Sequence, residues 1–195
     1  MLFRRKKGLD FNRRRRKVNY GLMKKVAIWT AEIIIVMLLA FACVHFFGKR
    51  VAVVGDSMTD TLKNEQQVFV NKFIYKIRKP KKNDIVVFKP NGNTKSHYYL
   101  RRVVATPGDT VQIKDGAVYV NGKIYQDERE YDSIENPGVA SKKIKLKKDE
   151  YFVLGDNRNY SEDSRYSNIG NVNIKYIEGK AWLRVVPFSD FGLVK

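Results

Sequence analysis

The sequence predicts a mainly β domain, built from antiparallel strands, behind one N-terminal membrane-spanning helix. Three observations support this prediction: a long apolar run near the N-terminus, short segments rich in Val, Ile and Tyr in the rest of the chain, and turn dipeptides between those segments. With 195 residues, 44% of them hydrophobic, the chain is long enough for one folded domain and an anchor.

The apolar run covers residues 26–47 and reads VAIWTAEIIIVMLLAFACVHFF, interrupted only by Thr30, Glu32 and His45. A helix needs about 20 apolar residues to cross the hydrocarbon core of a bilayer, so the run fits one span. A buried core helix of this length would need helical partners, and no long helical pattern follows it. Glu32 is a carboxylate within the span, a position that often signals function.

The basic residues concentrate ahead of the span. Residues 1–25 contain eleven Lys and Arg residues against the single acid Asp10, out of a net charge of +18 for the whole chain. The positive-inside rule then predicts a cytoplasmic tail over 1–25, a single-pass helix over 26–47 in the cell membrane, and an extracytoplasmic domain over 51–195. Charge placed this way favours a membrane partner over nucleic acid.

A cleavable signal peptide is the alternative to a retained anchor, because Ala40 and Ala42 form an A-x-A pattern. The apolar run is longer than the usual 7–15 residues of a signal peptide, which favours retention. A lipid-modified cysteine at Cys43 is disfavoured because Ala40 stands where a larger aliphatic residue is expected. As the only cysteine, Cys43 also excludes an intramolecular disulfide, and no ligand cluster implies a metal or organic cofactor.

The strands follow in order after the span. Asp115-Gly116 and Asn121-Gly122 are strong hairpin dipeptides and predict two tight turns. Residues 127–149 read as a solvated loop followed by a lysine-rich edge strand. The remaining predicted strands are 84–88, 98–105, 150–155 and 180–186, with a further alternating segment, VFVNKFIYKI, more typical of strand than of helix.

Four polar blocks are the candidates for chemistry. They read GDSMTDTL (55–62), NDIVVFK (83–89), YYLRRVVATPGDTV (98–111) and FVLGDNRNYSEDSR (152–165). In this order behind one span, the blocks resemble those of the bacterial type I signal peptidases, membrane serine endopeptidases with a Ser-Lys dyad. The resemblance covers nearly all of residues 26–190 and implies the β fold of that family for 51–195.

The resemblance also implies roles for matching residues. Ser57 matches the nucleophile, and its backbone N–H matches a donor of the oxyanion hole. Ser161 matches a serine that orients the base, and Asp163 with Arg165 matches a buried pair under the site. Supporting positions are Gly155 and Asp156, and an extended substrate would lie near 51–57 and 97–101, against Val53, Gly55, Asp56, Met58 and Tyr99.

The general-base position departs from the family pattern, because Arg101 stands where the family has lysine. A guanidinium keeps its proton at a pKa above about 12, so it is a poor base. Lys95 and His97 share the strand face of Arg101, but lie about 20 and 13 Å away along an extended strand. Two lesser departures are Asp60, where proline is usual, and Asn83, where glycine is common and left-handed angles are tolerated.

The resemblance implies an enzyme that removes N-terminal signal peptides from exported preproteins after small residues. The alternative, favoured by Arg101, is a catalytically impaired relative that serves as a binding or assembly factor for exported or pilus-like proteins. A self-cleaving repressor-like protease also joins a serine and a lysine in a β fold. The membrane span and the lack of a DNA-binding helix pair disfavour that third reading.

Overall fold

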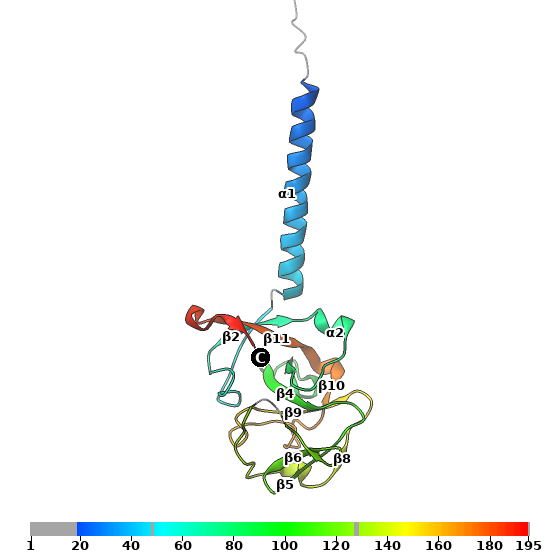
Figure 1. Cartoon of the computed structure of the whole chain (residues 1–195), viewed down its shortest axis with the longest axis vertical. Coiled ribbons are helices and arrows are strands. Elements are labelled where there is room, and N and C mark those ends of the chain that lie inside the picture. The colour runs from blue at the N-terminus through cyan, green and yellow to red at the C-terminus, as the bar shows by residue number, and fades with distance from the viewer. Residues whose placement is uncertain (1–18, 48, 127–128, 195) are drawn as a thin grey trace, which may run out of the picture. The chain divides into compact units, whose positions relative to one another are not determined.

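The computed structural model describes residues 19–47, 49–126 and 129–194 (Figure 1). The chain divides into two compact units after Phe41, and every described strand belongs to the second unit. Most of the predicted basic tail, residues 1–18, lies outside the described residues.

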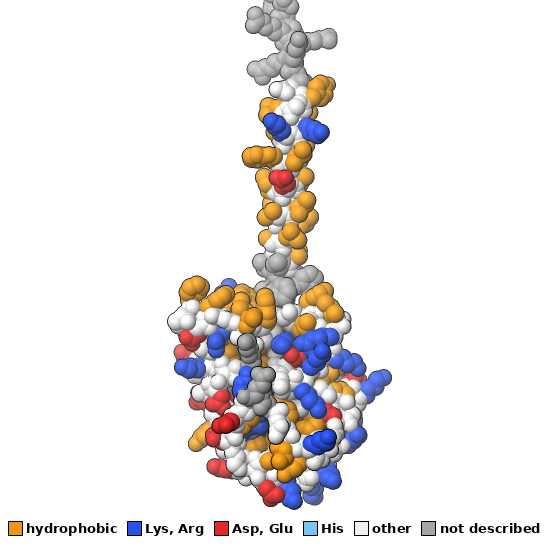
Figure 2. Space-filling view, viewed as in Figure 1, with side chains coloured by type: hydrophobic (Ala, Val, Ile, Leu, Met, Phe, Trp, Pro, Cys, Tyr) orange, Lys and Arg blue, Asp and Glu red, His pale blue; other side chains and the backbone are white. Residues whose placement is uncertain are grey.

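Helix α1 (Tyr20–Phe47) is 28 residues long and begins six residues before the predicted span. Asn19 precedes it and caps its first turn, because the Asn19 side chain accepts a hydrogen bond of 3.2 Å from the Leu22 amide. Among the described side chains of α1, exposed hydrophobic ones predominate on the face seen in Figure 2, with basic and acidic side chains between them. Among the described helices, α1 is the one long and apolar enough to cross a membrane, which confirms the predicted N-terminal apolar helix.

A large antiparallel sheet forms the body of the second unit, with strand order β1-β2-β11-β3-β4-β9-β10 and β12 paired to β11. Its members are β1 (Arg50–Ala52), β2 (Gln67–Asn71), β3 (Ile85–Phe88), β4 (Tyr99–Ala105), β9 (Glu150–Leu154), β10 (Val172–Asn173), β11 (Ile177–Val186) and β12 (Gly192–Leu193). Every pairing in this sheet is antiparallel, as predicted.

A second sheet has the order β7-β6-β5-β8, with β5 (Thr110–Lys114), β6 (Ala117–Val120), β7 (Lys123–Ile124) and β8 (Ile144–Lys145). Asp115-Gly116 joins β5 to β6 and Asn121-Gly122 joins β6 to β7, each with two positive φ angles. Consecutive positive φ angles are those of a type I′ turn, so both predicted hairpin tips are confirmed. The lysine-rich strand β8 lies at the sheet edge, also as predicted.

Three buried clusters hold the second unit together. One lies under the loop between β1 and β2 and includes Val53, Met58 and Leu62, each at most 2% exposed. Another joins the small sheet to Phe152 and Leu154 of β9. The first cluster therefore attaches the loop that carries the first polar block to the core, and the second attaches strand β9, which leads into the last polar block.

One segment differs from the prediction. VFVNKFIYKI was expected to be strand throughout, but β2 ends at Asn71 and a one-turn helix, α2 (Ile74–Ile77), follows. The Asn71 side chain accepts a hydrogen bond of 3.0 Å from the Ile74 amide and so starts the turn. Short 3₁₀ turns complete the unit at Pro90–Gly92, Gly138–Ser141, Ile174–Tyr176 and Phe188–Asp190.

Candidate active site

Ser57 lies in the loop between β1 and β2, with 6% of its surface exposed. Its neighbour Met58 is fully buried, and the Met58 carbonyl accepts a hydrogen bond from the Leu62 amide at 2.6 Å. Gly55 has φ of 79°, which turns the chain just before the serine. The Ser57 carbonyl accepts from the Asn157 amide at 3.1 Å. The serine is therefore fixed by a buried neighbour and by the 155–165 loop.

Arg101 projects from β4 toward Ser57. Its Nη1 donates to Ser57 Oγ at 2.7 Å and to the Leu100 carbonyl at 2.6 Å. Its Nε donates to the Glu162 carbonyl at 2.7 Å. The Tyr99 ring centroid lies 5.1 Å from Arg101 Cζ, close enough for a cation–π contact. These contacts hold the guanidinium in one position against the serine hydroxyl.

Burial lowers the pKa of Arg101 from its ordinary 12.5 to about 10, because only 5% of the residue is exposed and the charged form loses hydration. The acidic neighbours Asp163 and Glu162 offset part of this loss. The guanidinium is still charged at neutral pH, where it donates a hydrogen bond to Ser57 and cannot accept the serine proton.

Ser161 and Gly155 complete the surroundings of the serine. Ser161 Oγ is buried and finds no hydrogen-bond partner among the described residues. A Cβ atom added to Gly155 would lie 2.1 Å from Ser161 Oγ and 2.5 Å from the Ser57 carbonyl oxygen. No side chain fits at this position, so glycine is needed for the 155–165 loop to approach the serine this closely.

Asp163 and Arg165 form a fully buried pair beneath the loop. Arg165 Nε donates to Asp163 Oδ1 at 2.8 Å, and Nη2 donates to Oδ2 at 2.9 Å. Asp163 also accepts from the Gly155 amide at 3.1 Å, and Arg165 Nη2 donates to the Arg158 carbonyl at 2.5 Å. The pair thus fixes the loop backbone around Ser161 from inside.

A second buried pair was not foreseen from the sequence. Arg102 Nε and Nη2 donate to the two oxygens of Asp156 at 2.7 and 2.6 Å, and Thr61 Oγ1 donates to Asp156 Oδ2 at 2.5 Å. Arg102 Nη1 donates to the carbonyl of Asn83, which has the left-handed φ of 72° that its sequence position suggested. Because successive side chains of a strand point to opposite faces, Arg102 faces the other side of β4 from Arg101. A second arginine on that face was a signal in the sequence that an acidic partner was needed.

A small cavity of about 20 Å³ lies beside the Ser57–Arg101 contact. Its lining comes from two segments: Val53, Val54, Ser57, Met58, His97, Tyr98, Tyr99, Leu100 and Arg101. Three of the predicted substrate residues, Val53, Met58 and Tyr99, line the cavity, whereas Gly55 and Asp56 do not. A cavity of this size suits a small side chain.

Neither of the two other basic residues considered for the base role donates to Ser57 in a hydrogen bond found among the described residues. His97 lines the same small cavity, but its ring stacks on Tyr99 with ring centroids 4.7 Å apart. Lys95 is exposed in the loop before β4. Within the described residues, no group of three or more His, Cys, Asp or Glu side chains is placed to hold a metal ion.

Comparison with known proteins places this arrangement in a family. The family model described as signal peptidase, peptidase S26, matches residues 26–186. A relative named signal peptidase I P, from Bacillus subtilis subsp. natto, is 38% identical over 168 residues, covering 83% of this chain and 89% of the relative. Signal peptidase I T, from Bacillus subtilis strain 168, is 35% identical over 174 residues, covering 86% and 89%.

Two further proteins are similar. Signal peptidase IB, from Staphylococcus aureus strain COL, is 34% identical over 186 residues, covering 87% of this chain and 94% of the relative. The crystal structure of a signal peptidase I from Enterococcus faecalis V583 is 28% identical, with a TM-score of 0.41, covering 53% of this chain and 97% of that one. The family match spans most of the chain, and this protein belongs to the signal peptidase family, peptidase S26.

Proposed function

We propose that this protein is a membrane-anchored serine endopeptidase that removes signal peptides from exported preproteins, with Ser57 as the nucleophile. The family match supports the reaction, and the geometry around Ser57 supports the residue. The observation that carries the assignment is the hydrogen bond of 2.7 Å from Arg101 Nη1 to the buried Ser57 hydroxyl, beside a small cavity.

In the proposed reaction, Ser57 Oγ attacks the scissile carbonyl, and the peptide C–N bond breaks to give an acyl-enzyme. The leaving amine, which takes up the proton released by Ser57, becomes the new N-terminus of the mature protein, and water then hydrolyses the acyl-enzyme to release the signal peptide. The Ser57 backbone N–H donates to the oxyanion that develops on the substrate. Arg101 takes the serine proton only in its neutral form, and the fraction of Arg101 in this form increases as the pH approaches its pKa of about 10. Ser161, Asp163, Arg165, Gly155 and Asp156 position the base and the loop rather than touch the substrate.

Substrate selection follows from the size of the cavity. An extended peptide beside β4 would place one side chain in the space between Val53, Met58 and Tyr99. With about 20 Å³ available, alanine fits and large side chains do not. We therefore expect cleavage after a small residue, in a signal peptide that ends in A-x-A.

The apolar helix supports a single-pass topology. Residues 26–47 would cross the cell membrane and contact lipid, with 1–25 in the cytoplasm and 51–195 outside as the peptidase domain. Protease added outside intact spheroplasts should digest a tag fused after Lys195 and spare a tag fused before Met1. The reverse pattern would contradict this topology, and a mature chain starting near Cys43 would contradict a retained anchor.

The reaction is tested with the full chain in detergent and a preprotein whose signal peptide ends in A-x-A, at several pH values from neutral to about 10. Mass spectrometry of the products should show one cut after the final alanine. Replacing that alanine with phenylalanine should abolish the cut, because the cavity cannot hold the larger side chain. Absence of any cut in the alanine substrate at every pH would overturn the proposal.

A further inference from the structure

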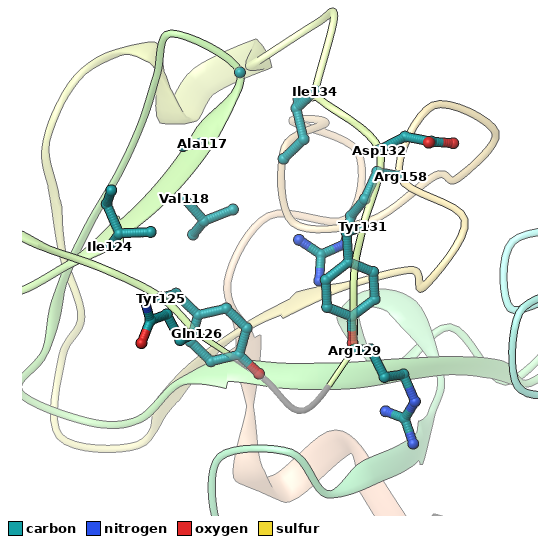
Figure 3. Close-up of a pocket in the computed structure, with 11 residues that line it drawn as sticks. Ala117, Val118, Ile124, Tyr125, Gln126, Arg129, Tyr131, Asp132, Ile134 and Arg158 are labelled. Carbon is teal, nitrogen blue, oxygen red and sulfur yellow. The ribbon is translucent and has the colours of Figure 1, made fainter.

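A second and larger cavity, of about 390 Å³, lies in the small-sheet region of the molecule (Figure 3). Its walls mix apolar side chains with the rings of Tyr125 and Tyr131, and Val118 and Ile134 form part of the apolar wall. Ligand cavities are commonly of this size. None of the residues assigned to the peptidase reaction lines this cavity.

Arg158 is the unusual member of the lining. It is 3% exposed, yet its Nε and Nη2 have no hydrogen-bond partner among the described residues. Figure 3 shows its guanidinium beside the Tyr131 ring, directed toward the side of the cavity where Val118 and Tyr125 lie. The ring centroid of Tyr131 is 3.6 Å from Arg158 Cζ. Two donor atoms of a charged group that are buried without acceptors lower the stability of the fold. The position of Arg158 therefore requires an explanation.

Two other buried arginines of the same protein show what this edge of a guanidinium binds. Arg165 uses Nε and Nη2 to hold both oxygens of Asp163, at 2.8 and 2.9 Å. Arg102 uses Nε and Nη2 to hold both oxygens of Asp156, at 2.7 and 2.6 Å. The edge that is empty on Arg158 is the two-point donor edge that matches a carboxylate.

Among the residues that the structure describes, no carboxylate supplies this partner. Asp156 lies close enough to favour the charged form of Arg158, but both of its oxygens are already engaged by Arg102. Burial lowers the pKa of Arg158, because the charge is desolvated without a matching anion.

We propose that this cavity is a binding site for a carboxylate attached to an apolar or aromatic group, with Nε and Nη2 of Arg158 holding the two carboxylate oxygens. The apolar group lies against Val118 and Ile134. Such a carboxylate can belong to a small organic acid or to an acidic side chain of a peptide.

The site is joined to the catalytic loop but does not depend on catalysis. The Arg158 carbonyl accepts from Arg165, and the preceding residue, Asn157, donates its amide to the Ser57 carbonyl. Binding is therefore tested without an activity readout, on the full chain in a nonionic detergent. A failed peptidase assay would leave the result of the binding experiment unaffected.

The experiment is a methyl NMR titration with 3-phenylpropionate and its uncharged amide. The acid should bind with a Kd of roughly 1 mM or tighter, and the amide at least about tenfold more weakly. The methyl signals of Val118 and Ile134 should shift, and those of Val53 and Leu100 in the active-site cavity should not. N-acetyl-aspartyl-phenylalaninamide and its asparaginyl counterpart form the second arm, and the tighter of the two acids identifies the source of the carboxylate.

Arg158→Gln should weaken binding of the better acid by about tenfold or more, whereas Lys143→Gln, which removes an exposed charge of the same region outside the cavity, should not. Equal binding of acid and amide would overturn the proposal, as would shifts confined to Val53 and Leu100 or the absence of binding. If Arg158→Gln does not fold, the comparison of acid and amide on the unchanged chain decides the question.

Discussion

Replacing Arg101 with lysine should increase peptidase activity. The guanidinium donates to Ser57 Oγ at 2.7 Å, so a group in this position is close enough to take the serine proton once it is neutral. Burial lowers the pKa of Arg101 to about 10, so only a small fraction of the arginine is neutral at pH 7. We expect the wild-type rate to be limited by that fraction.

The size of the gain follows from the ordinary pKa values of the two side chains. Lysine starts about two pH units below arginine, so the same burial would leave a neutral fraction about 100-fold larger. General-base assistance typically contributes about 10²–10⁴-fold, so the expected increase in kcat/KM at pH 7 is about 100-fold. We expect Ser161 Oγ, which is buried and has no partner among the described residues, to accept a hydrogen bond from the amine.

The assay is kcat/KM on one preprotein as a function of pH. Only the neutral base accepts the proton, so the wild-type value should rise about tenfold per pH unit toward pH 10, and Arg101→Lys should reach its plateau at lower pH. Arg101→Met, which fills similar space without a base, should lose the pH dependence, and Ser57→Ala combined with Arg101→Lys should be inactive. Brisk wild-type cleavage at pH 7 that Arg101→Lys leaves unchanged would refute this assignment of the base.

Three further substitutions test the surroundings of the site and one turn outside it. Gly155→Ala should reduce kcat/KM by about 10²-fold with the fold retained by circular dichroism, because the new Cβ would meet Ser161 Oγ at 2.1 Å and displace the loop. Asp156→Asn should lower the free energy of unfolding by about 3–5 kcal/mol in urea denaturation, since it removes one charge of a buried ion pair with Arg102; a loss below 1 kcal/mol, within the range of an exposed pair, would count against that role. Burial alone would raise the pKa of Asp109, but hydrogen bonds led by the Thr106 amide lower it to about 2. Its carboxylate therefore stabilises the fold above about pH 4 and loses this effect as the pH falls toward 2, so Asp109→Asn should reduce stability by about 1 kcal/mol at pH 7, after allowance for solvent screening, with little difference at pH 2.

The parts of the fold that could be predicted from the sequence are those set by local chemistry. Asp115-Gly116 and Asn121-Gly122 predicted hairpins because few other residue pairs take two consecutive positive φ angles. The apolar run predicted α1 from its length alone. Helix α2 was missed because a single hydrogen bond, from the Ile74 amide to the Asn71 side chain, ends the alternation that the pattern suggested. Strands of two or three residues, such as β1, are too short to leave a pattern.

The site itself depends on contacts between distant residues, which periodicity cannot reveal. Ser57 and Arg101 are 44 residues apart, and their pairing was expected only through the family resemblance. Arg102 and Asp156 are 54 residues apart, and the charge pair was missed although both positions were visible in the motifs. The alternation of a strand indicates that neighbouring arginines face opposite sides, but not which acid meets the second one.

The most direct test of the central claim is the cleavage of one preprotein by the full chain and by Ser57→Ala, in parallel at pH 7 and at pH about 10. The wild-type chain should release a signal peptide ending in a small residue, faster at the higher pH, and Ser57→Ala should release none at either. Equal release by both chains would show that Ser57 is not the nucleophile.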